Sequence, residues 1–95
     1  MIRSFANKDT EKLFNRLAFK RLPEDIQRTA LRKLRQLAAS VTLEQMAIPP
    51  GNRLEPLKGA RAGQHSVRIN DQWRICFTWK DGSAYDVEIV DYHRG

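Results

Sequence analysis

Two arginines, Arg68 and Arg74, are the residues whose type and spacing first suggest chemistry in this sequence. They lie on either side of the turn signal Asn70–Gln72, and the strand pattern described below places them directly opposite each other. Two cations across a ladder repel, so the pair requires either neighbouring carboxylates, for which Asp86 and Glu88 are the candidates, or a bound anion such as phosphate. A guanidinium group stays charged, so these side chains can stabilise negative charge but cannot exchange protons usefully.

Three stretches of alternating apolar and polar residues surround these arginines and predict antiparallel β-strands. They span Gln64–Ile69, Trp73–Trp79 and Ala84–Val90. A two-residue first loop would mix apolar and cationic side chains on one face, whereas a three-residue loop keeps each face uniform. The same argument predicts a second loop of three residues, Asp81–Ser83, which places Ile75 opposite Ile89 and Trp79 opposite Tyr85.

This register predicts a sheet with two different faces. One face is apolar and belongs to a core whose expected members are Phe14, Leu34, Leu37, Ile75, Phe77, Val87 and Ile89. The other face carries Arg68, Arg74, Cys76, Glu88 and, just beyond the third strand, Tyr92. Within that set Cys76 is interpreted as an inert packing residue, because free cysteines in strands behave as small hydrophobic residues.

Two helices are predicted before the sheet. Asp9 can cap the first, whose inward stripe would be Leu13, Phe14 and Leu17 and which would end near Phe19. The second begins with Pro23 at its first helical position and runs to about Ala39. Its expected apolar stripe is Ile26, Ala30, Leu34, Leu37 and Val41. Its basic residues are expected to lie largely away from that stripe, as a solvated face or a binding surface: Arg28, Arg32, Lys33 and Arg35.

The remaining segments complete an α+β arrangement, a single domain over residues 1–95 with N-terminal helices packed on an antiparallel sheet. Met1–Phe5 is expected to join an edge of the sheet. Thr42 and Gln45 form a capping-box pattern that predicts one further helical turn. Arg53–Leu57 can add a short edge strand, and Lys58–Gly63 is a basic loop that leads into the sheet.

Composition narrows the class of protein. The 95 residues include 17 Lys and Arg against 11 Asp and Glu, giving a net charge of +6 and a pI near 10.0. That balance favours a polyanionic partner such as nucleic acid, although solubility alone also explains basic charge in many small domains. The single cysteine excludes an internal disulfide, and without an apolar run long enough to cross a bilayer the protein is expected to be cytoplasmic. The spacing of the two histidines and the cysteine predicts no metal site.

Four motifs together resemble one protein family. They are M-I-R-S-F at Met1–Phe5, L-x-P-L-K-G at Leu54–Gly59, N-D-Q-W-R-I-C-F at Asn70–Phe77 and V-D-Y-H at Val90–His93. In this combination and order the chain is similar to the HigB-type toxins of the RelE/ParE superfamily of toxin–antitoxin pairs. The resemblance implies a compact α+β domain that enters the ribosomal A site and cuts messenger RNA without a cofactor. It also implies a HigA-like antitoxin with a helix-turn-helix domain, through which the toxin would reach operator DNA indirectly.

The resemblance assigns roles to particular residues. Lys58 and Arg74 match RNA-contacting and catalytic cations of the family, and Asp91, Tyr92 and His93 match its C-terminal catalytic cluster. The register argument adds Arg68 as a phosphate-binding residue, and the basic segments that lead into the sheet add Arg53 and Arg61.

One departure from the family pattern concerns the strength of catalysis. Glu55 occupies a position where some relatives have histidine, so a carboxylate there would add negative charge near a substrate phosphate. This substitution predicts weak activity without altering the fold.

Cleavage of the type that the family implies uses the ribose 2′-hydroxyl as nucleophile and requires a base, an acid and cations that stabilise the phosphorane. His93 can serve as acid or base, or can be a terminal residue without a role. Tyr92 can act as a base if nearby cations lower its pKa, or can stack on a base of the message. Asp91 can hold His93 or Arg74 in place.

Two other functions remain open on sequence grounds. One is a non-catalytic inhibitor of the ParE type, which poisons gyrase and shares the fold. The other is a basic module that binds RNA without cutting it. The clustered candidate acids and bases favour the endoribonuclease over both.

Overall fold

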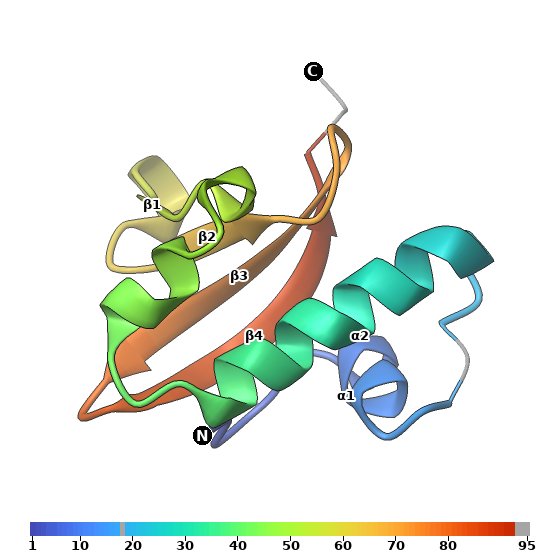
Figure 1. Cartoon of the computed structure of the whole chain (residues 1–95), viewed down its shortest axis with the longest axis horizontal. Helices are drawn as coiled ribbons and strands as arrows, with labels where there is room; N and C mark the ends of the chain where they lie inside the picture. Colours follow the sequence, from blue (N-terminus) through green and yellow to red (C-terminus); the bar gives the residue numbers. More distant parts are fainter. Residues whose placement is uncertain (18, 93–95) are drawn as a thin grey trace.

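An antiparallel sheet forms one layer of the computed structural model, which describes residues 1–17 and 19–92 (Figure 1). Within these residues the sheet has four strands in the order β1-β2-β3-β4. Their bounds are Glu55–Pro56 for β1, His65–Arg68 for β2, Trp73–Lys80 for β3 and Ser83–Asp91 for β4. The helices α1 (Lys8–Phe14) and α2 (Glu24–Ala39) pack on one face of this sheet, which confirms the predicted α+β class.

The hairpin between β2 and β3 has the predicted register. Val67 is paired with Ile75, and Arg68 is paired with Arg74. Asn70 organises the loop, because its Oδ1 accepts hydrogen bonds of 2.9 and 2.8 Å from the backbone N–H groups two and three residues further on. The two arginines are therefore fixed side by side by the turn that joins their strands.

The hairpin between β3 and β4 differs from the prediction near its loop. The loop contains two residues, Asp81 and Gly82, whose φ angles are 52° and 76°. Positive φ at both positions is typical of the type I′ turn, which Asp-Gly favours and whose twist matches that of the flanking strands. The predicted three-residue loop is therefore wrong, and Tyr85 pairs with Thr78 instead of Trp79.

A β-bulge absorbs the resulting shift of one residue. At Phe77 the register changes, because this residue faces Asp86 and the residue after it. Asp86 adopts a φ of 54°, and its backbone N–H donates a 2.8 Å hydrogen bond to Ser4 Oγ. Beyond the bulge the register returns to the predicted one, with Ile75 opposite Ile89.

The N-terminal segment lies along the free edge of β4, as predicted. Ile2 and Phe5 form isolated parallel bridges with Ala84 and Val87. Both side chains also pack against the core. This segment therefore closes the edge of the sheet that would otherwise expose unpaired backbone groups.

Helix α1 has a different cap and a different end from those predicted. Asn7, not Asp9, is the N-cap, and its Oδ1 accepts a 2.9 Å hydrogen bond from Thr10 N. The helix ends before Leu17, because Arg16 adopts a left-handed φ of 67°, and Leu17 is consequently 57% exposed instead of inward. Thr10 is buried, and its Oγ1 accepts a 3.0 Å hydrogen bond from a backbone N–H of β4.

Helix α2 ends at Ala39, as predicted, but Pro23 is its N-cap and not its first helical residue. Val41, which was expected on the apolar stripe, is 69% exposed because the helix has already ended. Lys33, which was expected to point away from that stripe, is buried. The fully buried residues of the helix are Ala30, Leu34 and Leu37.

Short 3₁₀ helices connect α2 with the sheet: η1 (Leu43–Ala47), η2 (Pro50–Asn52) and η3 (Gly59–Arg61). The predicted capping box is present at η1, where Gln45 Oε1 accepts a 3.2 Å hydrogen bond from Thr42 N. The predicted edge strand is β1, which lies between η2 and η3 and pairs with β2.

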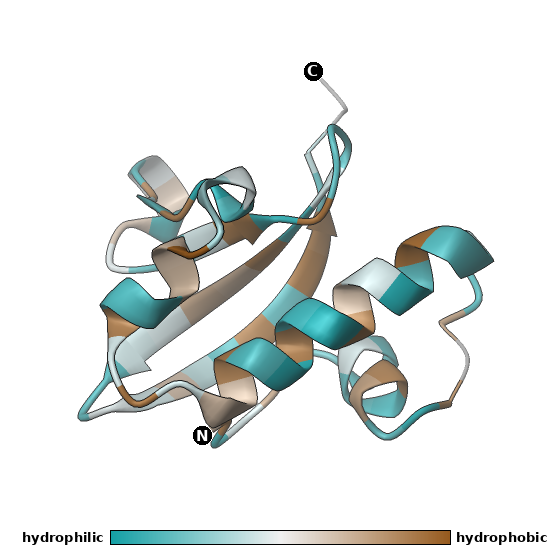
Figure 2. Cartoon of the chain, in the orientation of Figure 1, coloured by the Kyte–Doolittle hydropathy of each residue, from teal (hydrophilic) through white to brown (hydrophobic). Residues whose placement is uncertain are grey.

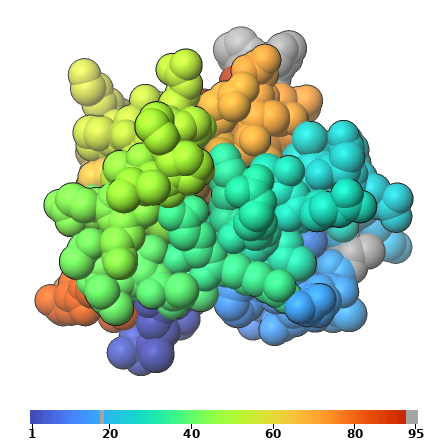
Figure 3. Space-filling view, in the orientation of Figure 1, coloured from blue at the N-terminus to red at the C-terminus, as the bar shows by residue number. Residues whose placement is uncertain are grey.

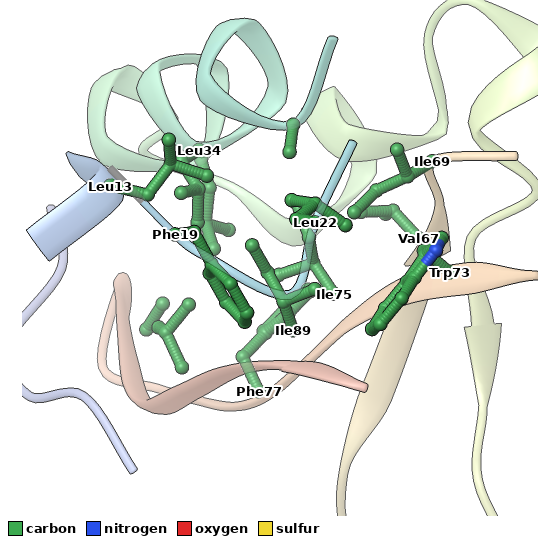
Figure 4. Packing of buried hydrophobic residues seen from close by; sticks show 14 of the residues in the cluster. Leu13, Phe19, Leu22, Leu34, Val67, Ile69, Trp73, Ile75, Phe77 and Ile89 are labelled. Carbon is green, nitrogen blue, oxygen red and sulfur yellow. The ribbon is translucent and has the colours of Figure 1, made fainter. Parts of the chain in front are cut away.

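The core lies between the helices and the sheet (Figure 4). Hydrophobic stretches of the strands meet the apolar stripe of α2 there, while the outer side of α2 is hydrophilic (Figure 2). In the space-filling view α2 and η1 hide much of the sheet (Figure 3). Every predicted core residue except Phe14 is buried, and Phe14 packs against the margin of the cluster. Leu13 and Trp73, which the sequence patterns placed on the inward side of the first helix and on the apolar face of the sheet, are buried as well, whereas sequence reasoning missed Phe19, Leu22 and Met46 as core members.

We predict that Phe77→Ala lowers the free energy of unfolding by about 3–5 kcal/mol, because it leaves a cavity where a fully buried ring packs. Urea denaturation measures this change. Leu17→Ala is the matched control and should change stability by less than about 0.5 kcal/mol, because that side chain is largely exposed. A loss below about 1 kcal/mol for Phe77→Ala would place this ring outside the core.

Candidate active site

The face of the sheet turned away from the helices carries the candidate site, and we call it the polar face. Residues paired across antiparallel strands point to the same side. One row across the four described strands therefore consists of Glu55, Ser66, Cys76 and Glu88. The next row consists of Arg68, Arg74 and Val90. Tyr92 follows by alternation beyond β4, and its ring centroid lies 5.8 Å from Arg74 Cζ.

Arg74 is the central residue of the polar face. Its side chain is only 11% exposed, and the Nε–H donates a 2.8 Å hydrogen bond to Ser66 Oγ. One N–H of Nη2 donates a 2.8 Å hydrogen bond to the carbonyl oxygen of Arg53. Ser66 lies with Arg74 on the side away from the helices, as the register predicted. The guanidinium is therefore held in one orientation by neutral acceptors.

The two neighbouring arginines are neutralised by carboxylates other than the expected ones. Arg68 forms an ion pair with Asp71, and Arg74 Nη2 lies 3.5 Å from Glu55 Oε1. Glu88, one of the expected partners, instead pairs with Arg61 at 3.2 Å. The expected pairing is wrong because Arg61 of η3, a segment that the register argument did not include, binds this carboxylate instead.

Asp86, the second expected partner, is also engaged elsewhere. It lies in the bulge of β4, where its Oδ1 is 3.5 Å from Ser4 Oγ. The carboxylates that neutralise the arginines thus come from the first loop and from β1, two segments that the register argument did not include.

A buried lysine beneath the polar face was missed. Lys33 of α2 is 7% exposed, and its Nζ donates a 2.5 Å hydrogen bond to the carbonyl oxygen of Arg68. Burial lowers the pKa of Lys33, and the positive charges of Arg32, Arg68 and Arg74 lower it further. The signal for its burial was present, because position 33 falls between the buried positions 30, 34 and 37 on the same side of a helix.

Tyr92 and Cys76 lie together, with the phenol oxygen 3.9 Å from Sγ. Burial raises the pKa of Tyr92, and the neighbouring Cys76 raises it further; these effects outweigh those of Arg61 and Arg74, which lower it. The hypothesis that nearby cations lower the pKa of Tyr92 is therefore wrong, and the phenol keeps its proton at neutral pH. Burial likewise raises the pKa of the Cys76 thiol, in keeping with a packing role.

Three further basic candidates lie in the segments that precede and follow β1. Arg53 adopts a left-handed φ of 46° and supplies its carbonyl oxygen to Arg74, while its side chain is exposed. Lys58 is exposed at the N-cap of η3. Arg61 is bound to Glu88 and also donates a 2.9 Å hydrogen bond to Gln64 Oε1. Arg61 is therefore more constrained than the other two.

The C-terminal candidates divide between two sides of the sheet. Asp91 pairs with Trp73, so its side chain points away from the polar face, and Oδ2 accepts a 3.1 Å hydrogen bond from Gln72 Nε2. Tyr92 lies on the polar face beside Arg74. His93 lies outside the described residues.

Over residues 1–17 and 19–92 there is no group of three or more His, Cys, Asp or Glu placed to hold a metal ion. No helix in the same residues is long and apolar enough to cross a membrane. The chemistry that the polar face offers is a fixed guanidinium, a protonated phenol and a half-exposed carboxylate, Glu55.

We predict that Ser66→Ala lowers the free energy of unfolding by about 1.5–3 kcal/mol, because it removes a buried acceptor from the charged Nε–H of Arg74. A double-mutant cycle with Arg74→Met measures the coupling. In the Arg74→Met background Ser66→Ala should cost much less, because no guanidinium remains to be satisfied. Equal costs in both backgrounds would contradict the hydrogen bond.

A family model matches residues 3–93 of this chain and is described as a RelE-like toxin of the type II toxin–antitoxin system HigB. Toxin HigB-1 of Vibrio cholerae is 40% identical over 73 residues, which cover 77% of this chain and 76% of that protein. Endoribonuclease HigB of Proteus vulgaris is 33% identical over 98 residues, which cover 98% of this chain and all of that protein.

Solved structures share the fold at lower sequence identity. YafQ from E. coli superposes with a TM-score of 0.63 at 17% identity, covering 97% of this chain and 94% of YafQ. A YoeB–YefM complex from Staphylococcus aureus gives a TM-score of 0.56 at 17% identity, covering 99% of both chains. These two likenesses concern the arrangement of helices and strands.

Proposed function

We propose that this chain, which belongs to the HigB-like family of RelE-like toxins of type II toxin–antitoxin systems, is an endoribonuclease that cuts messenger RNA on the ribosome. The name of the Proteus vulgaris relative, an endoribonuclease, supports this activity. The fold that the chain shares with other toxins is weaker support for endoribonuclease activity, because one fold can carry several functions.

The observation that carries the proposal is the guanidinium of Arg74. It is nearly buried, yet it lies on the polar face and not in the core, and Ser66 and Arg53 hold it in place. A preorganised cation of this kind can stabilise the charge that develops on a phosphorane without reorganising during the reaction. A plain RNA-binding surface requires cations but has no need for one so rigidly fixed.

The proposed reaction begins when the ribose 2′-oxygen attacks the adjacent phosphorus and its proton passes to a general base, a role for which His93 is a candidate. Arg74 stabilises the charge on the non-bridging oxygens. Tyr92, whose raised pKa keeps the phenol protonated, donates a proton to the departing 5′-oxygen. The products are a 2′,3′-cyclic phosphate and a 5′-hydroxyl. His93 stays a candidate for a second proton-transfer role, and Asp91 for a role in holding the C-terminal segment through Gln72.

The other cations are proposed to position the message. Arg68 lies opposite Arg74 and Arg53 contacts it through its carbonyl oxygen, while Lys58 is exposed two residues after β1. All three can bind phosphates on either side of the cleaved bond. Arg61 adds to the same field while it remains paired with Glu88. Together they explain how a small domain with a net charge of +6 holds RNA at one face.

A toxin of a type II toxin–antitoxin system is paired with an antitoxin. We infer a HigA-like antitoxin with a helix-turn-helix domain, through which the toxin reaches operator DNA indirectly. The positive charge of the toxin should attract an acidic surface on that partner. We place the toxin in the cytoplasm at the ribosomal A site, because its proposed substrate is translated there.

We predict that the chain cuts messages only while they are translated. Mapping 5′ ends of messages after induction, with and without translation, measures this dependence.

We predict that Arg74→Ala slows cleavage of ribosome-bound message by about 100-fold to 1,000-fold, by analogy with loss of one oxyanion donor. Single-turnover assays measure this rate. Arg74→Lys should restore only part of the rate, because ammonium lacks the planar fork that binds Ser66 and Arg53 together.

Two outcomes would contradict this assignment. Loss of ribosome binding by Arg74→Ala with an unchanged single-turnover rate would make Arg74 a phosphate anchor and not a catalytic residue. Toxicity with intact messages and inhibited gyrase would replace the endoribonuclease with the ParE-type inhibitor.

We predict that Tyr92→Phe slows the chemical step by about 100-fold or more, because it removes the proton donor and keeps the ring beside Arg74. Single-turnover cleavage at saturating toxin measures this step apart from binding. If Tyr92→Phe cuts at the normal rate while Tyr92→Ala is slow, the ring acts by stacking and the proton must come from another group.

A further inference from the structure

Arg61 lies between β1 and β2 in the sequence, yet it binds a carboxylate of β4. The strands are ordered β1-β2-β3-β4, so β3 separates β4 from β2 (Figure 1). Arg61 is the last residue of η3, and its Nη2 lies 3.2 Å from Glu88 Oε1. Neighbouring strands are about 4.8 Å apart, so the Arg61 side chain extends across the polar face instead of turning to solvent.

We propose that Glu88 is a positioning residue of the endoribonuclease, which holds the Arg61 guanidinium over the polar face, where it binds a phosphate of the message. This inference rests on the proposed function and deepens it, because it names a residue that acts on the message only through another side chain.

The surroundings of Glu88 place the ion pair beside the proposed proton donor. Glu88 is paired with Cys76, whose Sγ lies 3.9 Å from the phenol oxygen of Tyr92. Burial is the main cause of the raised pKa of Tyr92, and the positive charges of Arg61 and Arg74 oppose this rise. The charge of Arg61 therefore acts on the same phenol as that of the central guanidinium. A phosphate bound by Arg61 would lie on the part of the face where Tyr92 acts.

The ion pair is not needed to fold the segment that carries Arg61. A 2.8 Å backbone hydrogen bond from Leu57 N to the carbonyl oxygen of Gln64 closes this segment at its base. The side chains of Arg61 and Glu88 are 35% and 26% exposed, and ion pairs that water reaches contribute little to stability. What the pair determines is the direction of the Arg61 side chain.

Arg61 can bind a phosphate while Glu88 holds it. The described hydrogen bonds of its side chain are one from Nη1 to Gln64 Oε1, at 2.9 Å, and one from Nη2 to Glu88 Oε1. A guanidinium has five N–H donors, so these two bonds leave donors for a phosphate oxygen. The two acceptors fix the orientation of the group without using it up.

Charge alone predicts the opposite role for Glu88. A carboxylate on a face that binds RNA repels the phosphates, so its removal should strengthen the binding of the message. Under the proposal its removal weakens binding, because Arg61 is no longer held over the face. The two roles therefore predict changes of opposite sign for the same substitution.

The test is Glu88→Gln, measured alone and together with Arg61→Gln. Glu11→Gln is the matched control, because Glu11 is an exposed residue of α1 and its substitution removes the same charge from the helical layer. Single-turnover cleavage of ribosome-bound message gives two quantities for each protein: the toxin concentration that produces half of the maximal rate, and the maximal rate itself. Thermal unfolding of each variant is measured in parallel.

We expect Glu88→Gln to raise the half-saturating toxin concentration about 10-fold, because Arg61 loses the charged acceptor that orients it. The maximal rate should fall less, because Arg74 and Tyr92 remain in place. Arg61→Gln should raise the half-saturating concentration by a similar factor. In the Arg61→Gln background, Glu88→Gln should cause no further rise, since it then removes only a negative charge. Glu11→Gln should match the wild-type protein.

Four results would overturn the proposal. A lower half-saturating concentration for Glu88→Gln would make Glu88 a charge that repels the message, and an unchanged one would make it a bystander. Equal rises with and without Arg61 would mean that Glu88 acts independently of it. Unfolding of Glu88→Gln at the assay temperature would make the ion pair structural. If the wild-type protein does not cut at all, the proposed function fails together with this inference, whereas the four results above leave that function intact.

Discussion

The arrangement of the polar face depends on how the nearly buried guanidinium of Arg74 is satisfied. Arg74 projects from the middle of the sheet, where an unsatisfied guanidinium would cost several kcal/mol, and it is bound by Ser66 Oγ, the Arg53 carbonyl oxygen and the Glu55 carboxylate. These partners come from β2, from the segment after η2 and from β1. The segment from Arg53 to β1 is thus central to this arrangement, because it brings a carbonyl oxygen and a carboxylate to the same cation.

Local pattern predicted much of the fold because several signals agreed. Alternation required a three-residue first loop, and Asn70 supplied the turn chemistry, so the opposition of Arg68 and Arg74 followed from sequence. At the second hairpin the two signals disagreed. The Asp81-Gly82 turn preferred two residues, and the bulge at Asp86 restored the pattern, which alternation alone cannot anticipate. The end of α1 also escaped prediction, because the left-handed Arg16 moved Leu17 outward.

The sequence predicted which residues form the candidate site better than it predicted their ion pairs and the direction of their pKa shifts. The sequence indicated which residues share the polar face, but the partners of each charge depend on contacts between distant segments, such as Arg61 with Glu88 or Lys33 with the Arg68 carbonyl oxygen. The direction of the pKa shift of Tyr92 likewise depends on burial against Cys76, which outweighs the nearby cations. Glu55, which sequence reasoning treated only as a departure from the family pattern, forms an ion pair with Arg74 at 3.5 Å.

The central claim is that the polar face catalyses attack by a ribose 2′-hydroxyl on messenger RNA. The chemical nature of the cut ends tests it most directly. Message recovered from translating ribosomes after exposure to the purified toxin should end in a 2′,3′-cyclic phosphate, or in the 3′-phosphate that forms when this ring opens, on the upstream fragment, with a 5′-hydroxyl on the downstream fragment. A 5′-phosphate on the downstream fragment would require water as the nucleophile and would contradict the account.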